Sequence, residues 1–74
     1  MIKVTSITGE GYTEEGYRLV KASLVSDTAE EVADVTTGED IDGLTENDHL
    51  TLGSTCLAAN GDFGILNSSG VWTF

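Results

Sequence analysis

The last third of the chain, residues 50–74, contains two turn signals that limit the folds open to the whole sequence. Asn60-Gly61 separates two apolar runs, and this pair favours a type I′ turn because both central residues need a positive φ. Ser68-Ser69-Gly70 marks a second reversal, in which Gly70 is free to take a left-handed conformation. We therefore predict a β-meander with strands at Leu50–Ala58, Phe63–Leu66 and Val71–Phe74.

The beginning of the chain favours two further strands. Met1–Thr8 is rich in β-branched residues, which suit strands. The segment Gly9–Gly16 is rich in glycine and glutamate, so it predicts an exposed hairpin loop. In the next run, Tyr17–Val25, apolar residues occupy both faces. We expect a strand packed on both sides, or an edge used by another subunit with Tyr17 and Leu19 as candidate contacts.

A change of pattern at residues 26–36 predicts one short helix. Asp27 followed by Glu30 three residues later is typical of a capping box, and acids suit the positive end of the helix dipole. Ala29, Val32 and Ala33 would share one face and dock on the sheet, because a helix this short is not stable alone. The alternative is a structured loop without a helix.

The length of the chain, 74 residues, allows a single small domain with a marginal core. Its one cysteine, Cys56, excludes an internal disulfide, so we expect self-association to supply further stability. The predicted fold is mainly β. It is a small antiparallel sheet or partly closed barrel of about five strands with one short helix, and residues 1–74 form one domain.

The charge excludes several classes of partner. The formal net charge of −10 arises from 13 acids against Lys3, Arg18 and Lys21. Nucleic-acid binding needs clustered basic residues, and an anionic membrane surface would repel the chain. No segment has the length of a transmembrane helix, and no signal-peptide pattern is present. A single free cysteine fits a reducing cytoplasm.

The densest group of acids lies in the polar connection 37–49. Its candidate ligands for Ca²⁺ are Asp40, Asp42, Glu46 and Asp48. The EF-hand pattern fails, because Thr45 and Thr51 stand where a glycine and a glutamate are needed. We predict a solvated acidic segment anchored by Ile41 and Leu44, with a cation site as the alternative, and no metal or other cofactor.

The sequence pairs no nucleophile with a base, so we expect no enzymatic activity. His49 is expected at the surface or its boundary, and Cys56 is expected to be buried as a small hydrophobe. Trp72 and Phe74 share one face of the last predicted strand. They either close the core or contact another subunit, since tryptophan is frequent in interface hot spots.

Three short segments of the second half follow one another in a familiar order. They are Gly53-Ser54-Thr55-Cys56-Leu57, Gly61-Asp62-Phe63-Gly64-Ile65-Leu66-Asn67 and Gly70-Val71-Trp72. In this order of segments the chain resembles small structural-module proteins of tailed phages and prophages of Gram-positive bacteria. The segment Val32–Gly38, together with Leu44, looks like the linker of those proteins. Cys56, where alanine is expected, and Phe63-Gly64 depart from the pattern. The resemblance implies a head or tail accessory protein without catalytic residues, cytoplasmic in the host before assembly and part of the virion afterwards.

The sequence thus supports a first hypothesis and two rivals. The first is a non-enzymatic phage or prophage structural protein that forms homo-oligomers or docks on other phage structural proteins, without nucleic acid or membrane. The second is an acidic soluble inhibitor or binding protein that engages a basic partner. The third is a cation-dependent module built on residues 39–48.

Overall fold

Strands dominate the computed structural model, which describes residues 1–74, and the prediction of a mainly β fold is confirmed. The strands are β1 (Ile2–Tyr12), β2 (Arg18–Ser26), β3 (Ile41–Asp42), β4 (Asp48–Leu50), β5 (Thr55–Ala58), β6 (Phe63–Leu66) and β7 (Trp72–Thr73). One 3₁₀ turn, η1 (Ala29–Glu31), follows β2. All seven strands belong to one sheet, so the expected number of about five was too low.

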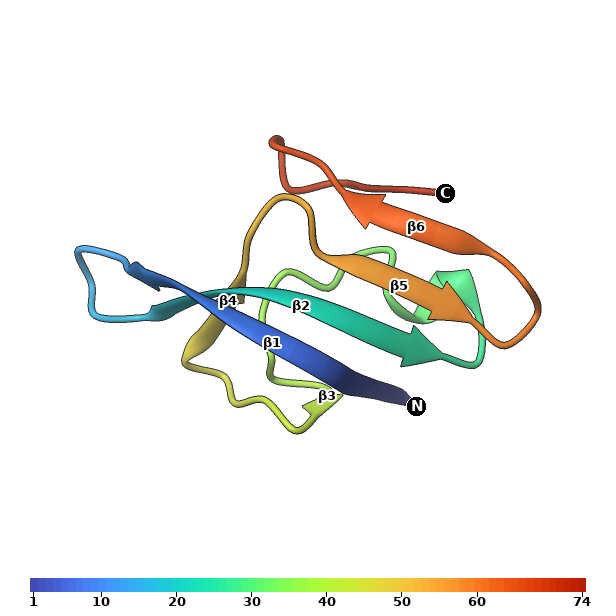
Figure 1. Ribbon diagram of the computed structural model, residues 1–74, viewed down its shortest axis with the longest axis horizontal. Coiled ribbons are helices and arrows are strands. Elements are labelled where there is room, and N and C mark those ends of the chain that lie inside the picture. The colour runs from blue at the N-terminus through green and yellow to red at the C-terminus, as the bar shows by residue number, and fades with distance from the viewer.

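The sheet is mixed and open, which corrects the predicted antiparallel sheet or partly closed barrel. Its order is β3-β1-β2-β5-β6-β7, and β4 also pairs with β2 (Figure 1). The hairpin pairs are antiparallel, whereas β1–β3, β2–β4 and β2–β5 are parallel. After β2 the chain crosses beneath the sheet, adds β3 to the far edge of β1, and then returns to the free edge of β2 with β4 and β5.

The predicted strand Leu50–Ala58 is broken into β4 and β5 by a turn at Leu52 and Gly53. Gly53 has a φ of 89°, which favours glycine. The buried Ser54 hydroxyl then accepts a hydrogen bond from the backbone N–H of Ala22 at 3.1 Å. This bond bridges the gap in the ladder between the two short strands.

The turn at Asn60-Gly61 is not the predicted type I′ turn, because no residue other than glycine has a positive φ. Gly61 alone is left-handed, with a φ of 100°, and its N–H donates to the Ala58 carbonyl at 2.9 Å. This geometry is the three-residue hairpin loop with a glycine bulge. Gly70, with a φ of 78°, confirms the left-handed conformation predicted there.

The strand predicted at Met1–Thr8 continues as β1 to Tyr12, past two irregularities in its pairing with β2. The hairpin loop is therefore shorter than expected. β1 and β2 form a ribbon that projects at one end of the molecule and turns at Thr13–Tyr17 (Figure 1). We call this projecting hairpin, residues 9–17, the arm.

The helix predicted at 26–36 is wrong, because only η1 forms there. Its hydrogen bonds join residues three apart, as from Val32 N–H to the Ala29 carbonyl at 3.2 Å. The capping role also shifts by one residue: the Glu31 carboxylate accepts from the N–H groups of Asp27 and Thr28. A segment this short lacks the further turns that propagate a helix.

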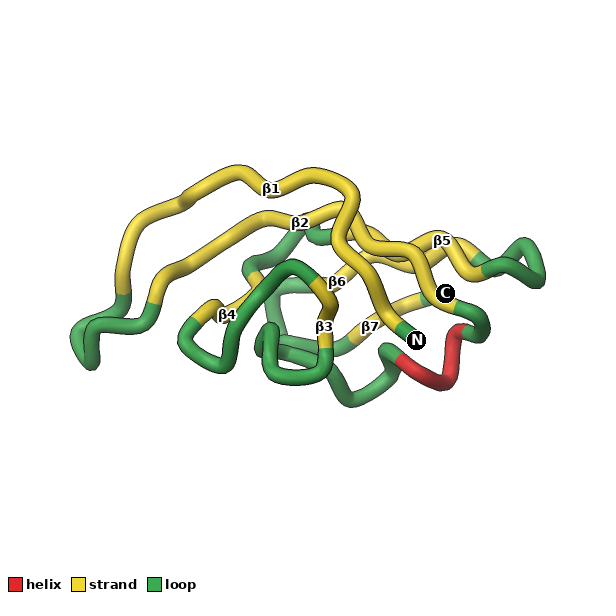
Figure 2. The backbone as a smooth tube through the Cα atoms, turned by 90° about the horizontal axis from the view of Figure 1, so that it is seen from below, coloured by secondary structure: helices red, strands yellow, loops and turns green.

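The core lies between the curved sheet and the segment that contains η1, β3 and β4, which runs beneath the arch of β1, β2 and β5 (Figure 2). Val32 and Ile41 from this segment pack with Val20, Leu24 and Trp72 from the sheet. Ile41 is buried and Leu44 is partly buried against the core, as predicted for the two anchors.

Candidate interaction surface

The side of the sheet that faces away from the core carries four partly exposed apolar side chains. Successive residues of a strand point to opposite faces, so burial of Leu24, Cys56 and Leu66 turns their neighbours outward. These neighbours are Val25 on β2, Leu57 on β5 and Phe63 and Ile65 on β6, and we call them the outer apolar face. Val25 lies opposite Leu57, and Leu57 lies opposite Phe63.

The outer apolar face exposes a few hundred Å² of apolar surface. Leu57 and Phe63 are 51% and 53% exposed, and Ile65 and Val25 are 45% and 37% exposed. Together they expose on the order of 300 Å², since a large apolar side chain presents roughly 150 Å² or more when fully accessible. Contiguous apolar patches of this order often mark interaction sites.

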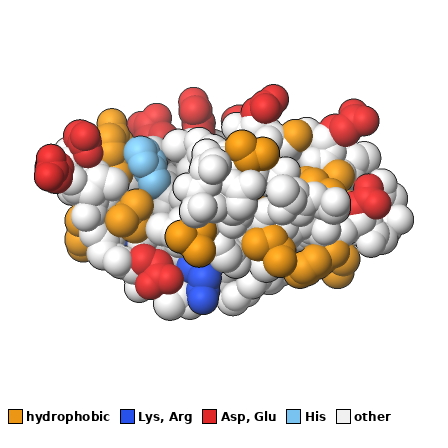
Figure 3. Space-filling view, turned by 90° about the horizontal axis from the view of Figure 1, so that it is seen from above, with side chains coloured by type: hydrophobic (Ala, Val, Ile, Leu, Met, Phe, Trp, Pro, Cys, Tyr) orange, Lys and Arg blue, Asp and Glu red, His pale blue; other side chains and the backbone are white.

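The strands that carry the outer apolar face, β2, β5 and β6, contain no acidic residue, whereas the exposed Asp42 of β3 lies opposite Lys3 on the same side of the sheet. Two of the basic residues do lie there: Lys3 is opposite Val25, and Lys21 points outward from β2. Neither lysine forms an ion pair. In Figure 3, hydrophobic side chains gather along the lower right beside a basic group, whereas most carboxylates lie along the upper and left edges.

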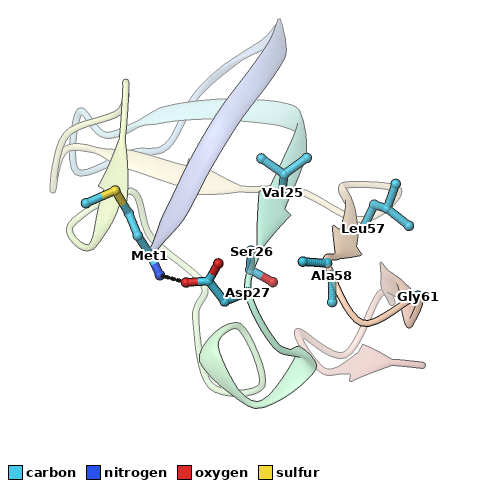
Figure 4. A pocket seen from close by; sticks show the side chains of 8 residues that line it. Met1, Val25, Ser26, Asp27, Leu57, Ala58 and Gly61 are labelled. Carbon is cyan, nitrogen blue, oxygen red and sulfur yellow. Dashed lines mark hydrogen bonds and ion pairs between the residues drawn. The ribbon is translucent and has the colours of Figure 1, made fainter.

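A hollow of about 540 Å³ continues the outer apolar face at the end of the sheet (Figure 4). It is lined by Met1, Val25, Ser26, Asp27, Leu57, Ala58, Ala59 and Gly61. Val25 and Leu57 belong to both features, so the hollow and the outer apolar face form one surface. The Asp27 carboxylate at its rim accepts a hydrogen bond from the Met1 amino group at 2.9 Å.

Trp72, a predicted interface candidate, belongs to the core. It is 6% exposed, and its Nε1–H donates to the Val35 carbonyl at 2.7 Å, so it joins β7 to the segment beneath the sheet. The Phe74 ring stacks on Trp72 with 6.3 Å between centroids and remains half exposed. Of the two roles considered for Trp72, core closure and contact with another subunit, the structure shows core closure.

Tyr17 and Leu19, the other two interface candidates, lie at the base of the arm. The ring of Tyr17 stacks on His49 with 4.3 Å between centroids. Leu19 is partly buried beside β4, opposite His49. Neither residue belongs to the outer apolar face. The sequence signal for an interface was the presence of apolar residues on both faces of the strand at 17–25. This signal led to Tyr17 and Leu19, whereas the residue of that strand that belongs to the outer apolar face is Val25, opposite Leu57 of β5.

The acids proposed as alternative cation ligands do not converge. Asp40, Asp42 and Glu46 are exposed, and the chain has no group of three acidic, histidine or cysteine side chains able to hold a metal ion. Asp48 is buried, and both of its carboxylate oxygens already accept hydrogen bonds. Arg18 Nε donates to Oδ1 at 2.8 Å, and the Thr45 N–H donates to Oδ2 at 3.0 Å. The hydrogen bond from Arg18 lowers the pKa of the Asp48 carboxyl.

Cys56 is fully buried, as expected. Its Sγ lies 3.3 Å from the hydroxyl of Ser26, which donates to the Thr28 carbonyl at 2.8 Å. The thiol therefore donates to Ser26. His49 is partly buried against Tyr17, as expected for a boundary residue.

Comparison of the chain with protein-family models, curated proteins and solved structures gives no match. No helix of the structure is long and apolar enough to cross a membrane.

Proposed function

We propose that this chain is a non-enzymatic structural or accessory protein of a phage or prophage, which acts by self-association or by docking on a larger virion component. The observation that carries the proposal is the outer apolar face, which is uncovered and lies on strands without acidic residues. The phage context is supported by the sequence resemblance at residues 53–72. Such a protein resides in the host cytoplasm before assembly and in the virion afterwards.

The size of the face supports a weak association. An apolar partner surface of equal size brings the total buried area to about 600 Å², about half of the ~1,200 Å² that a small stable interface buries. Loss of translational and rotational freedom opposes association. We therefore expect copies of the chain to associate only at high protein concentration.

Sedimentation velocity over a range of protein concentrations tests the proposal. The face variant Leu57→Thr/Ile65→Thr keeps residues suited to strands and removes apolar surface. The matched control, Ile7→Thr/Leu52→Thr, changes residues that are 40% and 64% exposed elsewhere. We expect the wild type and the control to associate, and the face variant to stay monomeric with an unchanged circular dichroism spectrum.

A wild type that remains monomeric at every concentration would contradict self-association, and docking on another virion component would then be the only form of the proposal to test. The rival function, binding of a basic partner through the acidic loops, predicts that the face variant binds that partner like the wild type. Loss of binding in the face variant would exclude this rival.

A further inference from the structure

On the basis of the proposed function, we propose that the outer apolar face of one copy receives the tip of the arm of a second copy. Copies of the chain then join head to tail. The occupant is identified by charge and shape: the arm carries acids on a preformed turn, and the outer apolar face carries unpaired lysines. Both surfaces belong to the same chain.

The arm presents a rigid and acidic tip. The Thr13 N–H donates to the Tyr17 carbonyl at 2.8 Å, and the Gly16 N–H donates to the Thr13 carbonyl at 3.0 Å. Gly16, with a φ of 93°, closes the same type of turn as Gly61. Glu14 and Glu15 are exposed on this turn and form no ion pair. Little ordering is therefore needed when the tip binds.

The receiving surface complements this tip. Lys3 lies beside Val25 and opposite Asp42 of β3, and Lys21 lies on the same side of β2, separated from Val25 by Ser23. Tyr12, 73% exposed next to the tip, offers an aromatic ring to the apolar side chains beyond Lys3. A carboxylate that approaches Lys21 meets no acid on β2, β5 or β6, whereas approach to the acidic loops meets repulsion.

The fold keeps the two surfaces of one copy apart. The arm projects at one end of the long axis of the molecule, which spans 36 Å, and β5 and β6 lie toward the other end (Figure 1). The tip therefore reaches the face of a neighbour and not its own. A contact between two different surfaces is heterologous, so it forms either a closed ring or an open filament.

Two other modes of self-association are less well supported. Packing of two outer apolar faces gives the exposed Glu14 and Glu15 of the arm no part in the contact. Pairing through the free edge of β1, beyond its pairing with β3, is hindered by the two register shifts in that strand and by Glu10, because bulges and charges protect edges.

Charge reversal at each surface tests the proposal. The tip variant is Glu14→Lys/Glu15→Lys, and the lysine variant is Lys3→Glu/Lys21→Glu. The control Glu39→Lys/Asp40→Lys changes the net charge as the tip variant does, at exposed acids outside the arm. We expect the control to associate at least as well as the wild type, and each test variant to show a dissociation constant raised about tenfold or more.

Mixing the two test variants gives the decisive result. The native tip of the lysine variant fits the native face of the tip variant, and the reversed tip of the tip variant is complementary in charge to the reversed face of the lysine variant, so we expect mixing to restore association that neither variant shows alone. If the tip variant associates like the control, or if mixing does not restore association, the head-to-tail contact is refuted. Loss of association in the face variant Leu57→Thr/Ile65→Thr would then still support the proposed function through another geometry, whereas a monomeric wild type refutes the head-to-tail contact and self-association together.

Discussion

Replacement of Trp72 by alanine removes the side chain that joins β7 to the segment beneath the sheet. Trp72 is 6% exposed, so nearly all of its ring is withdrawn from water, and its Nε1–H satisfies the Val35 carbonyl. Truncation of a buried tryptophan to alanine lowers the free energy of unfolding by ~3–5 kcal/mol. A domain of this length has ~4–11 kcal/mol in total, so Trp72→Ala should leave the chain at the limit of stability.

Urea unfolding followed by far-ultraviolet circular dichroism measures this loss without relying on the fluorescence of the residue that is changed. Phe74→Ala is the matched control: this ring stacks on Trp72 and is 51% exposed, so its loss should reduce the free energy by only ~1–2 kcal/mol. Trp72→Phe keeps most of the buried area but removes the donor to Val35, and we expect an intermediate loss of ~1–3 kcal/mol. If Trp72→Ala loses no more than Phe74→Ala, Trp72 does not hold the two layers together.

Further predictions concern the ion pair, a glycine and the thiol. The Arg18 guanidinium beside Asp48 holds the pKa of that carboxyl below its usual range, so the ion pair stabilises the fold above the pKa of an unfolded aspartate and is lost as the pH falls through the folded-state value. The difference in urea midpoint between wild type and Asp48→Asn should therefore shrink below about pH 4, and a constant difference would contradict it. Gly38→Ala should lower the Tm by about 10 °C, because the added Cβ would lie 2.5 Å from both the Leu44 Cβ and the Thr45 carbonyl oxygen. The control Gly9→Ala adds a Cβ with no atom within 4 Å and should change the Tm little, so an equal Tm for the two variants would refute this prediction. Cys56 should react with a disulfide reagent only as fast as the chain opens, and immediate labelling of the folded chain would show that the thiol is accessible.

The local features of the fold could be predicted from the sequence. Phe63–Leu66 is a strand with the predicted bounds, and the reversal at Gly70 uses the predicted left-handed glycine. Both depend on residues a few positions apart. The turn at Asn60-Gly61 was misassigned in type because a dipeptide does not determine which of two hairpin loops forms; here Asn60 stays at negative φ and Gly61 alone is left-handed.

The parallel pairing of β2 with β4 and β5 could not be predicted from the sequence. It joins Leu24 to Cys56 and Val20 to Leu50, about thirty residues apart, and a period of two is the same in parallel and antiparallel strands. For the same reason the sequence did not reveal the outer apolar face. Val25, Leu57 and Phe63 become one surface only through the pairing of three strands.

The distribution of charge decides how copies of this chain approach one another. Thirteen acids against three basic residues make most encounters between copies repulsive. Arg18 is already paired with Asp48, so Lys3 and Lys21 are the basic side chains left to attract a carboxylate, and both lie on the side of the sheet that carries the outer apolar face. Added salt screens both the general repulsion and any attraction at the lysines. Reversal of Glu14 and Glu15 moves the two in opposite directions, because it weakens the repulsion between copies and abolishes the specific attraction. If the tip binds at Lys3 and Lys21, the Glu14→Lys/Glu15→Lys variant associates more weakly than the wild type although it is less acidic. If general repulsion alone controls association, the same variant associates more strongly.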